Sequence, residues 1–189
     1  MPLWLGRALL LGVALLAVLG LGGCGADTAA AKDSLGTSLT ALQERDVQEA
    51  QKYFQAVWFD PEDYGVSVET FTDLYFEDFA YSLGKATVNN DGSVDVEATV
   101  STRDMATVLK DLQGASDAVF AASGGAAIRV GDADQYFYDS YKKSPWGSED
   151  TTFTVTMEQD DDGTWDVRDK GLLGAVLLHG YDPRQLGDW

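Results

Sequence analysis

The chain has very few of the residues that build disulfides or metal sites. Among its 189 residues there is one cysteine, Cys24, and one histidine, His179. An intramolecular disulfide, a cysteine-cluster metal site and a site with several histidine ligands are therefore excluded. We expect no cofactor. Because His179 follows an apolar segment, we expect it to be a helix C-terminal cap or a surface group.

Basic residues are also scarce, with 13 Lys and Arg against 31 Asp and Glu. Beyond position 23 there are 12 basic and 31 acidic residues, so that part carries a formal charge of −19. Such a charge repels a phosphate backbone and the anionic face of a membrane, and we expect no nucleic-acid partner. Cationic partners or metal ions stay open, although an acidic surface also serves solubility alone.

Long apolar runs are absent except at the start of the chain. Residues 8–21, ALLLGVALLAVLGL, follow Arg7, and this pattern is typical of a secretory signal peptide. The run is short for a membrane span, which needs about 20 apolar residues. It ends in Leu21, Gly22, Gly23 and Cys24.

These four residues resemble the lipobox of bacterial lipoproteins, an aliphatic residue three before a cysteine with small residues between. The resemblance implies cleavage before Cys24, lipidation of its thiol, and a domain attached by lipid to the extracytoplasmic face of the cell membrane. An uncleaved anchor helix and an ordinary signal peptide are the alternatives. We predict a signal peptide over 1–23, a lipidated small-residue tether over 24–34, one domain over 35–180 and a loose tail over 181–189.

Two consecutive helices are predicted after the tether. Leu35, Leu39 and Leu42 recur at helical spacing and predict a helix over 28–44. A second helix is expected over 47–59, where Asp46 and Glu49 form a capping box and the apolar positions are Val47, Ala50, Phe54 and Trp58.

Two hairpins follow, separated by further helices. Asn90-Asp91-Gly92 predicts a tight turn before the alternating strand Val94 to Val100. Helical spacing returns between Met105 and Phe120 and again over 132–143, ended by Gly124 and Pro145. A second hairpin has its turn at residues 160–163, between the strand pattern Phe153, Val155, Met157 and the pair Trp165, Val167; a short apolar helix over 172–177 ends the domain.

This order predicts an α+β fold, with a curved antiparallel sheet of about four strands packed against helices. The stretches ALQERDVQEAQKYF, YSLGKATVNNDGSVDVEATVSTRD and TFTVTMEQDDDGTWDVRDKGLLGAVL resemble bacterial lipoproteins with an NTF2-like or cystatin-like domain. The resemblance covers most of residues 35–180 and implies a sheet wrapped around a helix, in some members with a conical pocket.

Two groups of side chains are candidates for binding. The aromatic residues Tyr136, Tyr138, Tyr141 and Trp146 either line a ligand pocket or pack in the core at helical spacing. The acidic residues Glu158, Asp160, Asp162, Asp166 and Asp169, with Thr164, fall at the ligand positions of a calcium loop. Glu at the first position, Asp at the twelfth and strand-like flanks favour a hairpin turn instead, so no metal is expected.

Three functions are consistent with these patterns. We favour a membrane-tethered, non-enzymatic accessory domain that binds a ligand or partner. The alternative is a small NTF2-like pocket enzyme that uses an Asp/Tyr pair in an apolar cavity. An exposed apolar patch would instead indicate a protein-interaction module.

Overall fold

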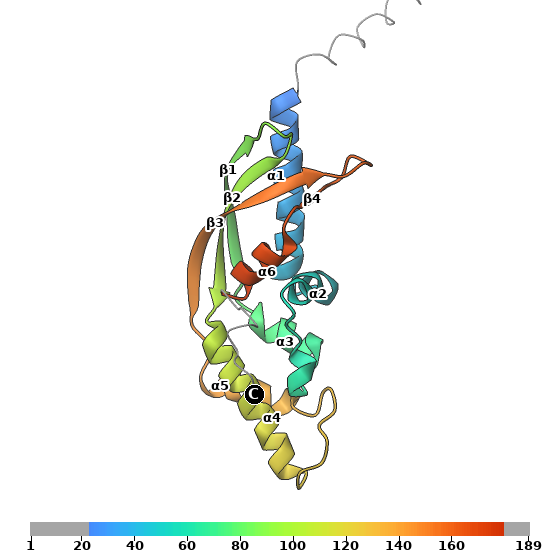
Figure 1. The fold of residues 1–189 in the computed structure, drawn as a ribbon. Coiled ribbons are helices and arrows are strands. Elements are labelled where there is room, and N and C mark those ends of the chain that lie inside the picture. Colours follow the sequence, from blue (N-terminus) through green and yellow to red (C-terminus); the bar gives the residue numbers. More distant parts are fainter. Residues whose placement is uncertain (1–22, 180–189) are drawn as a thin grey trace, which may run out of the picture.

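The structure, a computed structural model, describes residues 23–179 and follows the predicted order of helices, hairpin, helices, hairpin and short helix (Figure 1). The elements are α1 (Gly23–Gln43), α2 (Val47–Ala56), the 3-10 helix η1 (Pro61–Tyr64), α3 (Val68–Tyr75), β1 (Ala80–Val88), β2 (Val94–Arg103), α4 (Met105–Ala122), α5 (Asp134–Lys143), β3 (Ser148–Gln159), β4 (Trp165–Val167) and α6 (Lys170–Leu177).

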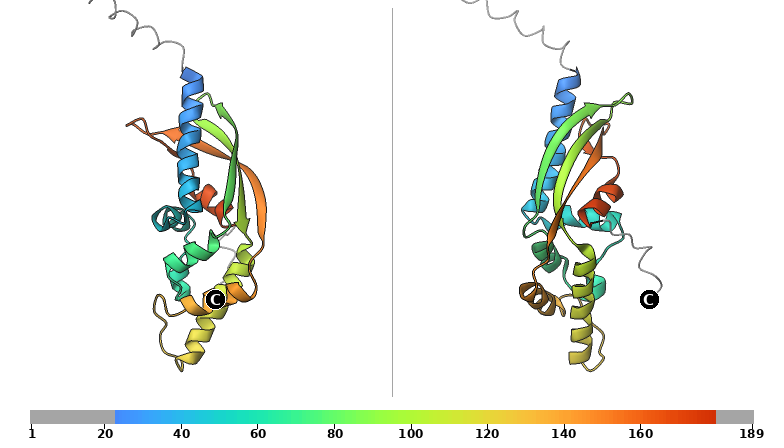
Figure 2. Two further views of the ribbon diagram at one scale, coloured as in Figure 1. Left: turned by 180° about the vertical axis from the view of Figure 1, so that it is seen from behind. Right: turned by 90° about the vertical axis from the view of Figure 1, so that its left-hand side faces the viewer.

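The four strands form one antiparallel sheet in the order β1-β2-β3-β4. The longest pairing joins β2 to β3, from Val94 opposite Met157 to Arg103 opposite Ser148. The sheet is curved, and α1 runs along it (Figure 2). The predicted α+β class with about four antiparallel strands packed against helices is confirmed.

Alternation along β2 creates the buried face of the sheet. Its four inward residues, Val94, Val96, Ala98 and Val100, are fully buried, whereas Glu97 between them is exposed. The predicted turn before β2 also forms: Gly92 has a φ of +87°, and its N–H donates to the carbonyl of Asn89. A residue with a Cβ rarely adopts that backbone angle, so the glycine fixes the hairpin.

One stripe of α1 is buried against this sheet. Ala31, Leu35, Leu39 and Leu42 are fully buried, and α1 contacts all four strands. The helix begins at Gly23, which corrects the predicted start at residue 28 and the predicted tether over 24–34. Alanine and lysine are strong helix formers, and burial of Ala31 extends the packed face toward the N-terminus, so this small-residue segment is helical.

The start of α2 agrees with its predicted cap only in part. The Asp46 carboxylate accepts from the N–H of Glu49 at 2.9 Å, as predicted. The Glu49 side chain does not return to the Asp46 backbone, because it bonds Lys52 and Tyr53 on the next turn. The capping box is therefore half formed.

The end of α2 differs from the prediction of a helix to residue 59. The Phe59 N–H donates to the Phe54 carbonyl and the Trp58 N–H to the Gln55 carbonyl, which is a Schellman motif. The Phe54 and Phe59 rings make its apolar contact, with centroids 5.6 Å apart. Trp58 takes the left-handed position, with a φ of +60° and 86% of its surface exposed, so its expected place in the core is wrong.

Aromatic rings connect the helices into one core. Phe71 on α3 is fully buried, and its ring centroid lies 5.3 Å from that of Phe54, 5.0 Å from that of Phe59 and 5.2 Å from that of Tyr75. The residues between 64 and 80, whose pattern is mixed in the sequence, thus fold because their aromatic side chains meet α2.

Helices α4 and α5 pack together at the end of the molecule away from Gly23 (Figure 2). A polar clamp joins α5 to the start of α3: the Asp134 carboxylate accepts from the Ser67 N–H and hydroxyl, both at 2.7 Å, and from the Thr70 hydroxyl at 2.8 Å. Three donors on one carboxylate fix the two helix starts relative to each other.

Replacing Trp58 by glycine is expected to stabilise the domain. Glycine adopts the left-handed conformation without the strain of a Cβ, and little packing is lost because Trp58 is 86% exposed. We expect the free energy of unfolding to rise by about 0.5–1 kcal/mol in urea denaturation. Trp58→Ala keeps the Cβ and is the control, with a change within about 0.5 kcal/mol. Equal effects of the two substitutions would contradict the strain at this position.

Candidate functional site

The predicted lipidation site lies at the edge of the described residues. Leu21 and Gly22 are outside them, Gly23 is the first residue of α1, and Cys24 is the second. The helix continues without a break from Cys24 to Gln43. Farther along α1, the Ser34 hydroxyl donates to the Trp165 carbonyl at 2.7 Å, which ties the helix to β4. Position 24 is thus joined to the core by a helix and not by a loop.

The four aromatic residues predicted as a pocket do not gather in one place. Tyr136 and Tyr138 on α5 are 43% and 42% exposed. Tyr141 and Trp146 are buried, with ring centroids 4.8 Å apart, and the ring of the buried Phe137 also contacts Trp146. Helical periodicity sends these side chains to different sides, so the four do not line a common pocket.

The buried pair instead belongs to a polar cluster around Arg103, at the end of β2. The Arg103 side chain is 5% exposed; it donates to the Trp146 carbonyl and to the Asp78 carboxylate, both at 2.7 Å. Its guanidinium also lies 5.9 Å from the centre of the Tyr141 ring. Arg103 therefore joins the segment after α3, the end of β2 and the loop before β3.

Tyr141 extends this cluster toward solvent. Its hydroxyl donates to the Glu77 carboxylate, and the Lys142 ammonium lies 3.7 Å from the other Glu77 oxygen. Burial of the ring, followed by the hydrogen bond to Glu77, raises the pKa of Tyr141 to about 12. Trp146 donates from Nε1 to the Asp111 carboxylate at 2.7 Å. Tyr141 is buried against Trp146 and Glu77 is 32% exposed, so the tyrosine and the carboxylate meet at the edge of the packed core.

Sequence reasoning did not identify Arg103, Glu77, Asp78 or Asp111 as a group. Arg103 breaks the alternation of β2, since both Thr102 and Arg103 are buried at its end. A period-two pattern places only one of two neighbours inward, so it gives no signal for this arginine.

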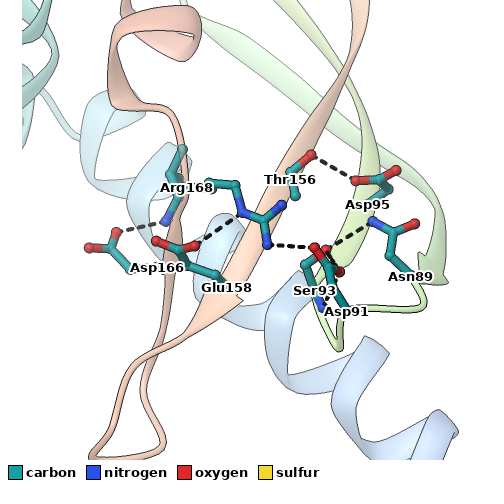
Figure 3. A network of polar contacts seen from close by, with 9 residues as sticks. Asn89, Asp91, Ser93, Asp95, Thr156, Glu158, Asp166 and Arg168 are labelled. Atoms are coloured by element: carbon teal, nitrogen blue, oxygen red, sulfur yellow. Dashed lines mark hydrogen bonds and ion pairs between the residues drawn. The ribbon is translucent and has the colours of Figure 1, made fainter.

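A second polar network crosses the two hairpins (Figure 3). Arg168, just after β4, donates from Nε to Glu158 and from its terminal nitrogen to Asp91, both at 3.0 Å. The Asp91 carboxylate also accepts from the Ser93 hydroxyl at 2.6 Å and the Ser93 N–H at 3.1 Å. The hydroxyl and N–H of Ser93, and then Arg168, lower the pKa of Asp91 to about 2.

The acidic residues of the calcium-loop pattern have separate places in this second hairpin. Glu158 pairs with Arg168, and Asp166 pairs with Lys170 at 2.6 Å. Asp162 accepts from the Thr164 N–H within the turn, Asp160 starts that turn, and Asp169 caps α6 through the Leu172 N–H. Residues 160–163 form the turn between β3 and β4. Within residues 23–179, no group of His, Cys, Asp or Glu side chains is arranged to hold a metal ion.

Two hollows in the described part are open to solvent. One, of about 800 Å³, lies between α1 and the edge strand β1. Its walls include Thr40 and Tyr81, whose hydroxyls are 2.7 Å apart, and Tyr81 donates to the Gly36 carbonyl at 3.0 Å. The other lies on the acidic turn between Glu158 and Asp162.

His179 follows α6, as predicted for a C-terminal cap or surface group. Its side chain is 30% exposed, and its Nε2 lies 3.7 Å from a Glu149 carboxylate oxygen. The searched residues, 23–179, contain no helix that is both long and apolar enough to span a membrane.

Comparison with known proteins gives little. No protein-family model matches the chain, and no curated protein matches it. Among solved structures, the chain is similar to ycdA from Bacillus subtilis subsp. subtilis str. 168, described there as a candidate lipoprotein. The identity is 20% and the TM-score 0.41, and the match covers 73% of this chain and 45% of that one. This chain thus spans less than half of that protein's length.

Loss of Arg103 should destabilise the fold far more than loss of a surface arginine. Arg103→Ala leaves the Trp146 carbonyl without its donor and opens space beside two aromatic rings, at a cost of about 2–3 kcal/mol in urea denaturation. Arg45→Ala is the matched control: its guanidinium is 39% exposed and lies 3.6 Å from Asp73. That change should cost no more than about 0.5 kcal/mol. Similar losses for both variants would show that Arg103 has no special structural role.

Asp91 should make the domain sensitive to acid. Because its pKa is lower in the folded state, the carboxylate contributes stability that is complete above its ordinary pKa of about 4 and is lost as the pH falls to about 2. As the pH is lowered from about 4 to about 2, the melting temperature of Asp91→Asn should therefore fall less than that of the wild type. In an NMR titration, Ser93→Ala should raise the pKa of Asp91. An Asp91 carboxylate that titrates near 4 in the wild type would refute the assignment.

Proposed function

We propose that this chain is an extracytoplasmic lipoprotein, held to the membrane by lipid on Cys24, whose domain binds a partner or ligand without transforming it. The sequence Leu21-Gly22-Gly23-Cys24 after an apolar leader supports the anchor. The observation that carries the proposal is the continuity of α1 from Cys24 into the core, where Ala31, Leu35 and Leu39 are fully buried. An anchor at this position holds the whole domain, and not a flexible tail.

The charge of the domain supports lipid as the means of attachment. The chain beyond position 23 carries a formal charge of −19, which an anionic bilayer surface repels. Two acyl chains anchor a protein durably because each buried methylene contributes about 0.8 kcal/mol, whereas a single chain is marginal. The lipid therefore holds the domain without electrostatic help.

The surface of the domain supports binding over catalysis. The open groove between α1 and β1 and the exposed aromatic residues Trp58, Tyr136 and Tyr138 are accessible to a large partner. The titratable groups with the densest contacts, Arg103 and Tyr141, are enclosed by packed side chains and join structural elements. A partner-binding domain presented at the membrane fits these properties.

Replacing Cys24 by serine tests the anchor. A serine hydroxyl cannot form the thioether, so Cys24→Ser should move the protein from the membrane fraction to the soluble fraction or leave an unprocessed precursor. Fractionation and mass spectrometry of the N-terminal peptide measure both outcomes. Glycine in place of Ala30, also near the start of α1, is the control and should stay membrane-bound. A Cys24→Ser protein of mature size that is fully membrane-bound would contradict the proposal.

A further inference from the structure

Trp58 is the most exposed large apolar side chain among the described residues. It is 86% exposed, and the next, Leu172, is 55% exposed. Tryptophan has the largest side chain in proteins, and aromatic side chains are enriched where proteins bind partners. Trp58 also stands at a left-handed backbone position, with a φ of +60°, where a side chain adds strain.

The helix cap alone does not require a tryptophan. The same motif ends α1, where the Asp46 N–H donates to the Ala41 carbonyl and Arg45 takes the left-handed position with a φ of +64°. At the end of α1 the left-handed position is thus occupied by a polar residue, Arg45, whose guanidinium lies 3.6 Å from the Asp73 carboxylate. The apolar contact of the α2 motif is made by Phe59 and not by Trp58. Neither the cap nor the core therefore accounts for the indole.

The segment that follows Trp58 is acidic. Asp60, Glu62 and Asp63 follow within five residues and are exposed. No ion pair within residues 23–179 engages these three carboxylates, in contrast to Asp166, which pairs with Lys170. The first turn of α6 lies beside the end of α2, since a Cβ on Gly171 would be 3.4 Å from the Ala56 carbonyl oxygen. Leu172, the second exposed apolar residue, comes from that turn.

The position of Trp58 separates it from the proposed anchor. Trp58 follows α2, and α2 lies beside the end of the 21-residue helix α1 that is opposite Gly23 (Figure 1). A helix of this length spans about 30 Å. The exposed indole is therefore open to a molecule that approaches the domain away from Cys24.

We propose that Trp58, with Asp60, Glu62 and Asp63, is a docking site for a basic segment of a partner protein, in which an arginine or lysine side chain stacks on the indole. Tryptophan is the best aromatic partner for a cation, and the three carboxylates match the charge of the neighbouring basic residues. The inference rests on the proposed function of the domain as a binding module and specifies the chemistry of its partner.

The test uses the full chain in detergent micelles and a fluorescently labelled octa-arginine peptide. Fluorescence anisotropy at physiological ionic strength measures the dissociation constant. We expect it to rise by about tenfold in Trp58→Ala, because the stacked cation is lost. Glu62→Gln with Asp63→Asn should weaken binding to a similar extent. Trp58→Gly should bind as poorly as Trp58→Ala although it folds more stably, which separates binding from stability.

Two matched controls separate a local site from diffuse charge. Asp160→Asn with Asp161→Asn removes the same charge from the acidic turn between β3 and β4, and Phe120→Ala removes another exposed aromatic ring. Both should leave the dissociation constant within about twofold of the wild type. Equal weakening by the Asp160/Asp161 pair, an unchanged affinity in Trp58→Ala, or no binding of the peptide by the wild type would each overturn the inference. None of these results affects the anchor, which the Cys24→Ser fractionation tests separately.

Discussion

The burial of one face of α1 against the sheet is the contact on which the rest of this structure depends. Ala31, Leu35, Leu39 and Leu42 form a stripe that is removed from water along about three turns of α1, a helix that contacts every strand. Each such leucine contributes about 1.5–3 kcal/mol to stability by its burial. Truncating α1 within this stripe would therefore remove a large share of the net free energy of folding of a domain. Ala31, the first residue of the stripe, lies about two helical turns after Cys24. The packing of α1 on the sheet therefore also holds the first residues of the domain in place.

This arrangement divides the molecule by role. The sheet and α1 form the part next to the proposed anchor, with the Asp91–Arg168–Glu158 network joining the two hairpins on its surface (Figure 3). The aromatic rings around Phe71 connect that part to α4 and α5, and Arg103 closes the junction. Trp58 follows α2 and is exposed to solvent, whereas its neighbour Phe59 is buried in this aromatic core. An outward-facing indole beside a packed core suits recognition, since little motion is lost when a partner binds.

The sequence predicted those features that depend on local periodicity and turn chemistry. Alternating valines gave β2, Gly92 gave the first turn, and the leucine spacing gave α1. Other features depend on contacts between segments that are distant in the sequence. Arg103 is buried because Asp78 and the Trp146 carbonyl accept its hydrogen bonds, and the periodicity of β2 predicts neither contact. The error at Trp58 has a similar cause. It lies four residues after Phe54 and fits the helical stripe, but the Phe54–Phe59 contact ends the helix first and turns the indole outward.

The central claim is that the residues next to Cys24 belong to the folded core. Native-state amide hydrogen exchange on the membrane-extracted protein tests it most directly, because exchange reports the stability of each backbone hydrogen bond. The account predicts that amides from Lys32 to Gln43 exchange as slowly as those of β2, with protection decreasing only toward Cys24. Rapid exchange through residue 34, with protection beginning after it, would show a flexible tether and contradict the account.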